Sequence, residues 1–203
     1  MTRKLIINIG RQFGSGGLLV AKAIGKKLGI PVYDKEIITK TAQDSGFSTG
    51  LFIENDEKRN FLSLTSLFSQ GFGNCNDDYM SGGNLFRIQS ETILRIAEQG
   101  PAVIIGRCSD YILRDTGYTL DVFLTAPEEV RTARIAERTC IDMDKARELM
   151  HKKDKSRAQY YNYFTFGNWG EASNYDLCID TEILGIEGTA EYIIDFARRA
   201  GRL

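Results

Sequence analysis

The chain has 203 residues, 42% hydrophobic and 26% charged, a composition typical of one well-cored globular domain. Lysine and arginine total 26 against 27 acidic residues, so the formal net charge is −1 and a nucleic-acid polymer is not an expected partner. No apolar run is long enough to span a membrane, and the apolar stretch at the N-terminus is too short for a signal peptide. The four cysteines form no CxxC pair, which favours reduced thiols, a cytoplasmic location and no zinc site.

Five short apolar runs predict buried strands, and amphipathic segments between them predict helices. The predicted strands are residues 5–9, 30–33, 101–105, 121–124 and 175–180. The predicted helices are residues 18–28, a short one from 35, 85–98, 127–138, 143 to about 161, and 190–199. Strands that alternate with helices in this way indicate a parallel sheet covered on both faces. Ligands of such sheets bind at the carboxyl ends of the strands, so the residues after each strand are the candidates for a site.

Residues 45–84 differ in composition from the rest of the chain. They are rich in glycine, serine and asparagine, and residues 70–78 show no periodicity. Apolar residues at helical spacing occur at 61–68. We predict an insert with one or two helices and a flexible loop. Its apolar patch would permit a homodimer, or it would be buried under the lid.

A glycine-rich turn follows the first predicted strand, with four glycines among the eight residues from Gly10 to Gly17. Glycine permits positive φ angles, and the amides of such a turn bind phosphate together with the positive end of the following helix. A tight turn without a ligand is the alternative, although it needs fewer glycines.

Neither common phosphate-binding pattern is complete in this turn. The P-loop pattern GxxxxGK[ST] is absent, because Gly17 stands at the lysine position and leucines follow where a hydroxyl could meet Mg²⁺. The dinucleotide pattern GxGxxG is half-present, with Asp34 placed 20 residues after Gly14 where a ribose-binding acid would lie.

Four segments, taken in chain order, carry a resemblance to a known family. They are residues 9–17 (IGRQFGSGG), 29–34 (GIPVYD), 103–113 (VIIGRCSDYIL) and 175–181 (YDLCIDT). With them the sequence resembles the cytidylate kinase-like family, a lysine-less branch of the P-loop nucleoside monophosphate kinases, over nearly the whole chain and least across residues 45–84.

The resemblance implies both a fold and an activity. The fold is a single three-layer α/β P-loop domain over residues 1–203, with a five-stranded parallel sheet, a helical insert like a nucleoside monophosphate-binding segment at about 45–84 and a lid at about 140–172. The activity is phosphoryl transfer from ATP, with Mg²⁺, to a nucleoside monophosphate or another small-molecule acceptor.

Candidate residues for binding ATP come from the turn, and cations must replace the missing lysine because phosphoryl transfer depends on positioning and positive charge. Arg11 is the nearest substitute, unless it is a solvent-facing loop arginine. Arg107 matches the Gly-Arg that binds the acceptor in cytidylate kinases, with a structural salt bridge as the alternative. The turn residues expected to bind ATP are Gly10, Gln12, Phe13, Gly14, Ser15, Gly16 and Gly17.

Two aspartates that follow strands are candidates for binding the acceptor. Asp34 would act as a base for an acceptor hydroxyl or cap the helix that begins after it. Asp110 would contact the acceptor or cap the short helical segment that follows it.

The predicted lid contributes Asp154 and Arg157, which share one helix face with Tyr161. The resemblance assigns to this pair a closing contact over the donor and acceptor phosphates, and a plain helical salt bridge is the alternative. Aromatic residues are expected to anchor the lid to the body rather than stack a base. These residues are Tyr160, Tyr161, Tyr163, Phe164, Phe166 and Trp169.

Three arginines on the preceding helix, Arg131, Arg134 and Arg138, also share one face. We interpret them as members of surface pairs with Glu128 and Glu137, or as a basic rim beside the lid. His151 is the chain's single histidine, so no histidine-based triad or multi-histidine metal site is proposed.

Three functions fit these patterns. The first is an ATP-dependent kinase of a nucleotide or other small molecule. The second is a nucleotide-binding regulatory module that has lost turnover along with the lysine. The third and weakest is a Rossmann-type dinucleotide binder.

Overall fold

The computed structural model describes residues 5–44 and 79–203, and its centre is one five-stranded parallel sheet. The strands follow the order β2-β3-β1-β4-β5, which places β1 in the middle. The predicted five-stranded parallel sheet is therefore confirmed. Their bounds are β1 (Ile6–Arg11), β2 (Val32–Tyr33), β3 (Ala102–Ile105), β4 (Thr119–Thr125) and β5 (Leu177–Asp180).

The end of β1 differs from the prediction in a way that matters for the site. Gly10 and Arg11 continue the strand and pair with Phe123 and Leu124 of β4, whereas the sequence predicted a turn from Gly10 onward. A Cβ on Gly10 would lie 2.7 Å from the Phe123 ring, so glycine is required here for close packing rather than for a turn. The strand therefore carries Arg11 to the carboxyl edge of the sheet.

Seven α-helices are described, and most match the predicted segments. α1 ends at Gly29, which adopts a left-handed conformation as the C-cap, as expected of that residue. α9 begins at Thr181 rather than at residue 190, because Asp180 caps it through the Glu182 amide and its first turns continue across a kink at Gly185. The helices are α1 (Gly17–Leu28), α2 (Lys35–Asp44), α5 (Tyr79–Gln99), α6 (Ser109–Ile112), α7 (Glu128–Thr139), α8 (Met143–Thr165) and α9 (Thr181–Arg199).

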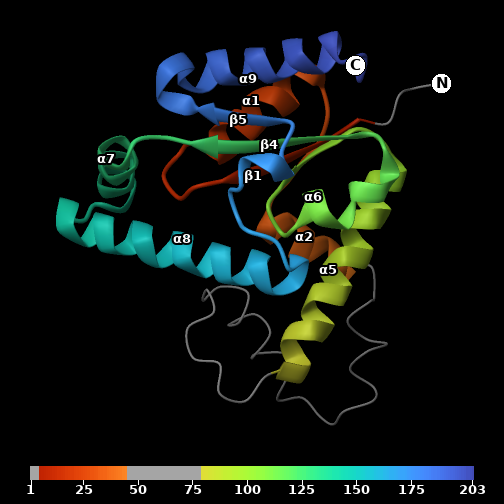
Figure 1. Cartoon of the computed structure of the whole chain (residues 1–203), viewed down its shortest axis with the longest axis horizontal. Coiled ribbons are helices and arrows are strands. Elements are labelled where there is room, and N and C mark those ends of the chain that lie inside the picture. The colour runs from red at the N-terminus through yellow and green to blue at the C-terminus, as the bar shows by residue number, and fades with distance from the viewer. Residues whose placement is uncertain (1–4, 45–78) are drawn as a thin grey trace.

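The sheet lies between two helical layers, as Figure 1 shows with α1 and α9 on one side and α2, α5 and α6 on the other. Alternate side chains of β1 enter the two layers. Ile7 and Ile9 pack with residues of α1 and α9, and Ile6 packs with Ile38 of α2 and Ile93 of α5. Both faces of the sheet are thus covered, as the continuous apolar strands predicted.

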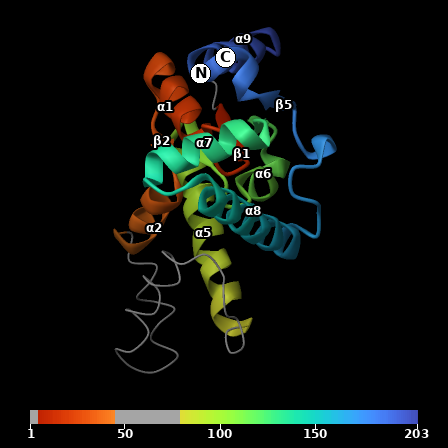
Figure 2. The same ribbon diagram turned by 90° about the vertical axis from the view of Figure 1, so that its left-hand side faces the viewer.

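α7 and α8 form a hairpin with a separate small core. Ile135, Ala146 and Met150 are fully buried between the two helices, and Phe13 from the glycine-rich turn packs against them. Figure 2 shows α7 and α8 in front of β1. The segment predicted as a lid, which consists mainly of α8, therefore contacts the turn through an apolar side chain.

Several sequence predictions lie outside the described residues. They are the body of the insert at residues 45–78, its apolar patch at 61–68 and Cys75, whereas residues 79–84 form the start of α5. In the ranges 5–44 and 79–203, no helix is both long and apolar enough to cross a membrane.

Candidate functional site

The glycine-rich turn connects β1 to α1 at the centre of the carboxyl edge. Gly14 and Gly16 have φ angles of 85° and 83°, which favour glycine. The turn is closed from within by the Ser15 hydroxyl, which donates to the Gln12 carbonyl at 2.9 Å. From outside, the Thr181 hydroxyl at the start of α9 donates to the Ser15 carbonyl at 2.6 Å. The conformation of the turn is therefore fixed by hydrogen bonds within the protein.

The amides of the turn divide into two groups. The Gln12 amide donates to the Leu124 carbonyl and the Phe13 amide to Asp154. Over the described part of the chain, no acceptor is present for the amides of Gly14, Gly16, Gly17 and Leu18. These four donors lie at the N-terminus of α1, where a helix attracts negative charge. They are the groups through which the turn could bind a phosphate.

The Arg11 side chain occupies the space that a side chain at position 17 would need. A Cβ on Gly17 would be 2.9 Å from both Cβ and Cγ of Arg11, and a Cβ on Gly106 would collide with the Arg11 guanidinium. The side chain thus runs from β1 past the start of α1 toward the end of β3. Burial lowers the pKa of Arg11, and Arg157 and Arg107 lower it further. A lysine at position 17 and an arginine at position 11 would compete for the same space.

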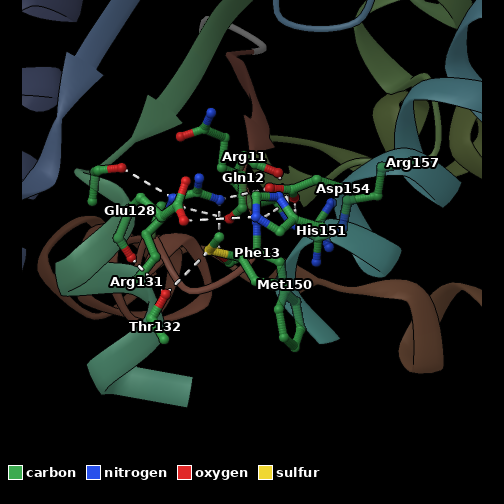
Figure 3. Close-up of polar contacts among 12 residues, drawn as sticks. Arg11, Gln12, Phe13, Glu128, Arg131, Thr132, Met150, His151, Asp154 and Arg157 are labelled. Carbon is green, nitrogen blue, oxygen red and sulfur yellow. Dashed lines mark hydrogen bonds and ion pairs between the residues drawn. The ribbon is translucent and has the colours of Figure 1, made fainter. Parts of the chain in front are cut away.

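Asp154 and Arg131 join the α7–α8 hairpin to the turn (Figure 3). Asp154 accepts the Phe13 amide at 2.7 Å and an Arg131 guanidinium N–H at 2.6 Å. Arg131 is only 7% exposed and also donates to the carbonyls of Ala126 and Phe13, at 3.0 and 3.3 Å. Glu128 instead pairs with Arg147 at 3.2 Å, so the prediction of a Glu128–Arg131 surface pair is wrong.

Arg157 reaches the same turn from α8. Its guanidinium donates to the Arg11 carbonyl at 2.9 Å and lies 5.3 Å from the centre of the Phe13 ring. The distance to Asp154 is 3.8 Å, longer than either of the other contacts of that carboxylate. Burial lowers the pKa of Arg157 to about 10, so it stays a cation at neutral pH. The predicted partners Asp154 and Arg157 are therefore brought together at the turn.

Arg107 lies at the end of β3 in an unusual backbone conformation. Gly106, Arg107 and Cys108 all have positive φ angles, of 68°, 60° and 56°. For the two non-glycine residues this region costs roughly 1–2 kcal/mol each. The Arg107 guanidinium lies 5.3 Å from the centre of the Tyr160 ring on α8. Its position is thus fixed against the helix that also carries Arg157.

The two aspartates predicted to bind the acceptor each have partners in the protein. One Asp34 carboxylate oxygen accepts the amides of Glu36 and Ile37, each at 3.0 Å, which is the geometry of a helix cap for α2. Asp110 accepts the Tyr161 hydroxyl at 2.8 Å, and burial raises the Asp110 pKa.

The aromatic residues at the end of α8 mostly pack against the body. Phe164 stacks on Phe86 of α5 with ring centres 4.2 Å apart, and Tyr160 meets the same ring edge-on. Trp169 packs edge-on against Phe123 of β4. The predicted anchoring is confirmed for these three residues, whereas Phe166 is 93% exposed.

The side chains at the turn do not form a protein-held magnesium site. Leucines occupy positions 18 and 19, and the hydroxyls of Ser15 and Thr181 donate to backbone carbonyls. No group of three or more histidine, cysteine or carboxylate side chains that could hold a metal ion is found in the part of the chain that the structure covers.

Sequence reasoning singled out Arg131 on a helix face with Arg134 and Arg138, but it did not identify the partners of Arg131, which are far away in the chain. It did not single out Lys35. Lys35 directly follows Asp34 after β2, and the rule that strand ends carry the site could have pointed to it. The electrostatic neighbours of Lys35 include Arg107 and Lys153.

Comparisons with known proteins identify the family of this chain. A model of the cytidylate kinase-like family matches residues 6–183. The cytidylate kinases of Methanococcus aeolicus and Methanocaldococcus jannaschii are 26% and 28% identical to the chain. These matches cover 93% and 91% of this chain and 95% and 92% of the two relatives.

Solved structures show the same architecture. An uncharacterized protein from Eubacterium ventriosum superposes with a TM-score of 0.73 at 28% identity, over 95% of this chain and 98% of its own. A gluconokinase from Sinorhizobium meliloti has a TM-score of 0.54 at 16% identity, covering 98% and 97% of the two chains, and shares the fold alone. The three-layer P-loop kinase fold is thus confirmed, and the protein belongs to the cytidylate kinase-like family.

Proposed function

We propose that the protein transfers the γ-phosphoryl group of ATP to a nucleoside monophosphate of the cytidylate type. The observation that carries this proposal is the position of Arg11, which runs past Gly17 and brings a guanidinium to the edge where a P-loop lysine would supply an ammonium. Membership of the family and two relatives named cytidylate kinase support the reaction and the acceptor class.

The triphosphate of ATP would bind to the free amides of the turn. The donors at Gly14, Gly16, Gly17 and Leu18 lie in the turn and at the N-terminus of α1, and backbone donors of this kind bind phosphate without side-chain charge. Arg11 then adds the charge that these neutral donors lack. ATP would enter as its magnesium complex, in which the ion neutralises part of the phosphate charge.

In the transfer step, an oxygen of the acceptor phosphate attacks the γ-phosphorus and the bond from that phosphorus to the bridging oxygen of ADP breaks. The products are ADP and a nucleoside diphosphate. Little covalent chemistry is required of the protein, because positioning and positive charge supply most of the rate enhancement. We assign the stabilisation of the transferred group to Arg11 and Arg157, and the binding of the acceptor to Arg107.

Asp154 and Arg131 act in this proposal as positioning residues. Asp154 is engaged by the Phe13 amide and by Arg131, so its carboxylate orients the turn and the neighbouring guanidinium of Arg157. The guanidinium groups of Arg157 and Arg138 both contact the Phe13 ring, at 5.3 and 5.1 Å from its centre. The ring contact helps to hold Arg157 beside the turn.

The test is product formation from ATP and Mg²⁺ with a panel of acceptors. The panel contains CMP, UMP, AMP and GMP, with gluconate and shikimate as hydroxyl acceptors. Formation of ADP together with a nucleoside diphosphate supports the proposal. ATP that binds tightly without any turnover would instead favour a regulatory nucleotide-binding module, and phosphorylation of a hydroxyl acceptor alone would contradict the assigned substrate class.

A further inference from the structure

The loop between β3 and α6 is strained, and it carries Arg107. Gly106, Arg107 and Cys108 have φ angles of 68°, 60° and 56°, and only the first of these residues is a glycine. Left-handed conformations at other residues persist where the surrounding structure holds them in place. Contacts from outside the loop are therefore needed to keep Arg107 in its position.

Two neighbouring tyrosines of α8 supply such contacts. The Tyr160 ring has the Arg107 guanidinium over it, 5.3 Å from the ring centre. The hydroxyl of Tyr161, a buried residue, donates to an Asp110 carboxylate oxygen at 2.8 Å. One tyrosine thus holds the side chain of Arg107, and the other holds the first turn of α6, into which the loop runs.

Tyr160 is itself held in place by α5. Its hydroxyl donates to Oε1 of the buried Gln89 at 2.8 Å. Its ring meets Phe86 edge-on and lies 4.9 Å from the Phe164 ring, which in turn stacks on Phe86. A phenol fixed both at its hydroxyl and through its ring has little freedom to move. The ring therefore offers the guanidinium of Arg107 a fixed surface.

The same helix carries Arg157, three residues before Tyr160. Side chains at positions i, i+3 and i+4 share one helix face. On that face Arg157 donates to the Arg11 carbonyl at the end of β1, while Tyr160 contacts Arg107 beyond the end of β3. One helix thus sets the spacing between its own guanidinium and that of Arg107, at the ends of two adjoining strands.

We propose that Tyr160 is a positioning residue for Arg107, and that Tyr161 supports it by holding the start of α6 through Asp110. This inference rests on the proposed function, in which Arg107 binds the acceptor. An aromatic ring attracts a guanidinium without neutralising it, whereas a carboxylate would also occupy its N–H donors. The ring of Tyr160 therefore fixes Arg107 and leaves N–H groups for an anion.

The first experiment is steady-state kinetics with ATP and the preferred nucleoside monophosphate. Tyr160→Leu should raise the KM for this acceptor about 5–30-fold, as expected when a partly desolvated cation–π contact is lost. The KM for ATP should change less than twofold, which also shows that the variant is folded. Tyr160→Phe keeps the ring and should stay within about threefold of the wild type. A loss as large as that of Tyr160→Leu would show that the ring is not what positions Arg107.

Tyr163→Leu is the matched control on the same helix. Tyr163 is exposed and packs edge-on against Phe164. Its replacement should leave the KM for the acceptor within twofold of the wild type. A rise equal to that of Tyr160→Leu would mean that any lost ring on α8 has this effect, and it would overturn the assignment.

A double-mutant cycle separates positioning from a structural role. If Tyr160 acts through Arg107, the effect of Tyr160→Leu on the KM for the acceptor disappears in an Arg107→Ala background. In an Arg157→Ala background the same substitution should keep its full effect. A merely structural role would give the same loss in both backgrounds, and that result would overturn the proposal.

The supporting contact of Tyr161 is tested without any turnover. The amides of Ile112 and Leu113 donate to the carbonyls at the start of α6, so their hydrogen exchange reports the opening of this segment. Tyr161→Phe should speed this exchange about tenfold or more, because the hydrogen bond to the Asp110 carboxylate is lost. Tyr163→Phe should leave the exchange unchanged. Equal exchange in wild type and Tyr161→Phe would reject the supporting role.

The positioning role and the kinase activity can fail separately, and calorimetric titration with CMP distinguishes the cases. Binding of CMP that Tyr160→Leu weakens only while Arg107 is present, without any turnover, would retain the positioning role and reject the kinase. Turnover in which the losses of Tyr160→Leu and Arg107→Ala multiply would do the reverse. A chain that neither binds nor phosphorylates a nucleoside monophosphate would reject both.

Discussion

The two halves of the carboxyl edge of the sheet differ in how their charged side chains are paired. Beside the glycine-rich turn, Arg131 and Asp154 are both nearly buried and are joined at 2.6 Å, with further hydrogen bonds to the backbone. Beside β2 and β3, Lys35 and Arg107 have no carboxylate partner within the described residues. The first half holds an almost buried ion pair, whereas the carboxylates near the second half, Asp34 and Asp110, are engaged by backbone amides and by the Tyr161 hydroxyl.

This difference assigns different tasks to similar side chains. A buried ion pair with satisfied hydrogen bonds fixes the geometry of the groups around it. Cations held close together without a counter-charge repel one another, and a bound anion relieves that repulsion. The Arg131–Asp154 pair therefore holds the turn in place, and we expect Lys35 and Arg107 to remain available to a bound anion.

The largest expected effect is the loss of stability when the built-in pair is broken. Asp154→Ala leaves the Arg131 charge buried without its partner, which should lower the free energy of unfolding by about 3–5 kcal/mol. Denaturant unfolding measures this directly. Asp144→Ala removes a carboxylate that is 93% exposed in its pair with Arg147, and should change the value by less than about 0.5 kcal/mol. Equal effects of the two variants would remove the distinction between the halves of the edge.

The next largest expected effect is a loss of activity when Arg11, the proposed substitute for the P-loop lysine, is replaced. Arg11→Met should lower kcat/KM about 10²–10³-fold, because a preorganised donor to the transferred group is lost. Steady-state kinetics with ATP and the preferred acceptor measure this. Since Arg11 and a side chain at position 17 share space, Gly17→Lys should recover part of the activity only when Arg11→Ala is also present. Recovery by Gly17→Lys with Arg11 intact would argue against that shared space.

A smaller effect is expected from the arginine that bonds to the turn. Arg157→Ala should lower kcat about 10–100-fold while the KM for ATP changes less than threefold, because its contact strengthens in the transition state. Arg138→Ala is the matched control, since Arg138 lies 5.1 Å from the centre of the same Phe13 ring but is exposed on α7. A loss of ATP affinity in Arg157→Ala with kcat unchanged would make this residue a binding group only.

The smallest effect involves Asp121, a carboxylate that has hydrogen bonds but no ion-pair partner among the described residues. Burial raises its pKa to about 6, although the Asn8 amide at 2.7 Å acts in the opposite direction. The folded state then binds the proton more tightly than the unfolded state, so this contribution to stability is lost as the pH rises from about 4 through 6. Asp121→Asn should be more stable than wild type by about 1–2 kcal/mol at pH 8, with the difference vanishing toward pH 4. Thermal unfolding measured from pH 4 to pH 8 checks this. If the ionised carboxylate were stabilising, the wild type would instead gain stability relative to Asp121→Asn as the pH rises.

The sequence predicted the sheet and the turn because both are encoded locally. Continuous apolar runs identify strands, and the glycines between residues 10 and 17 identify the turn from β1 to α1. The end of β1 could not be predicted, because Gly10 serves close packing against Phe123, which is distant in the chain. The start of α9 was obscured by Gly185 and Gly188, which interrupt the helical pattern.

Within the site, residue types were predictable but their partners were not. Arg11, Asp154 and Arg157 stand out in the sequence, and the structure brings all three to the turn. The burial of Arg131 depends on how α7 packs against α8, and its bond to Phe13 spans 118 residues. A surface pair is the local expectation for such an arginine, and tertiary packing overrides it.

In the proposed reaction, a guanidinium from β1 takes over the task of the missing lysine. The most direct measurement is a crystal structure of the full chain with a non-hydrolysable ATP analogue and Mg²⁺. The account predicts β- and γ-phosphates on the amides of Gly14, Gly16, Gly17 and Leu18, with the Arg11 guanidinium within hydrogen-bond distance of them. A triphosphate bound away from these amides, or one contacted by another cation while Arg11 stays beside Gly106, would contradict it.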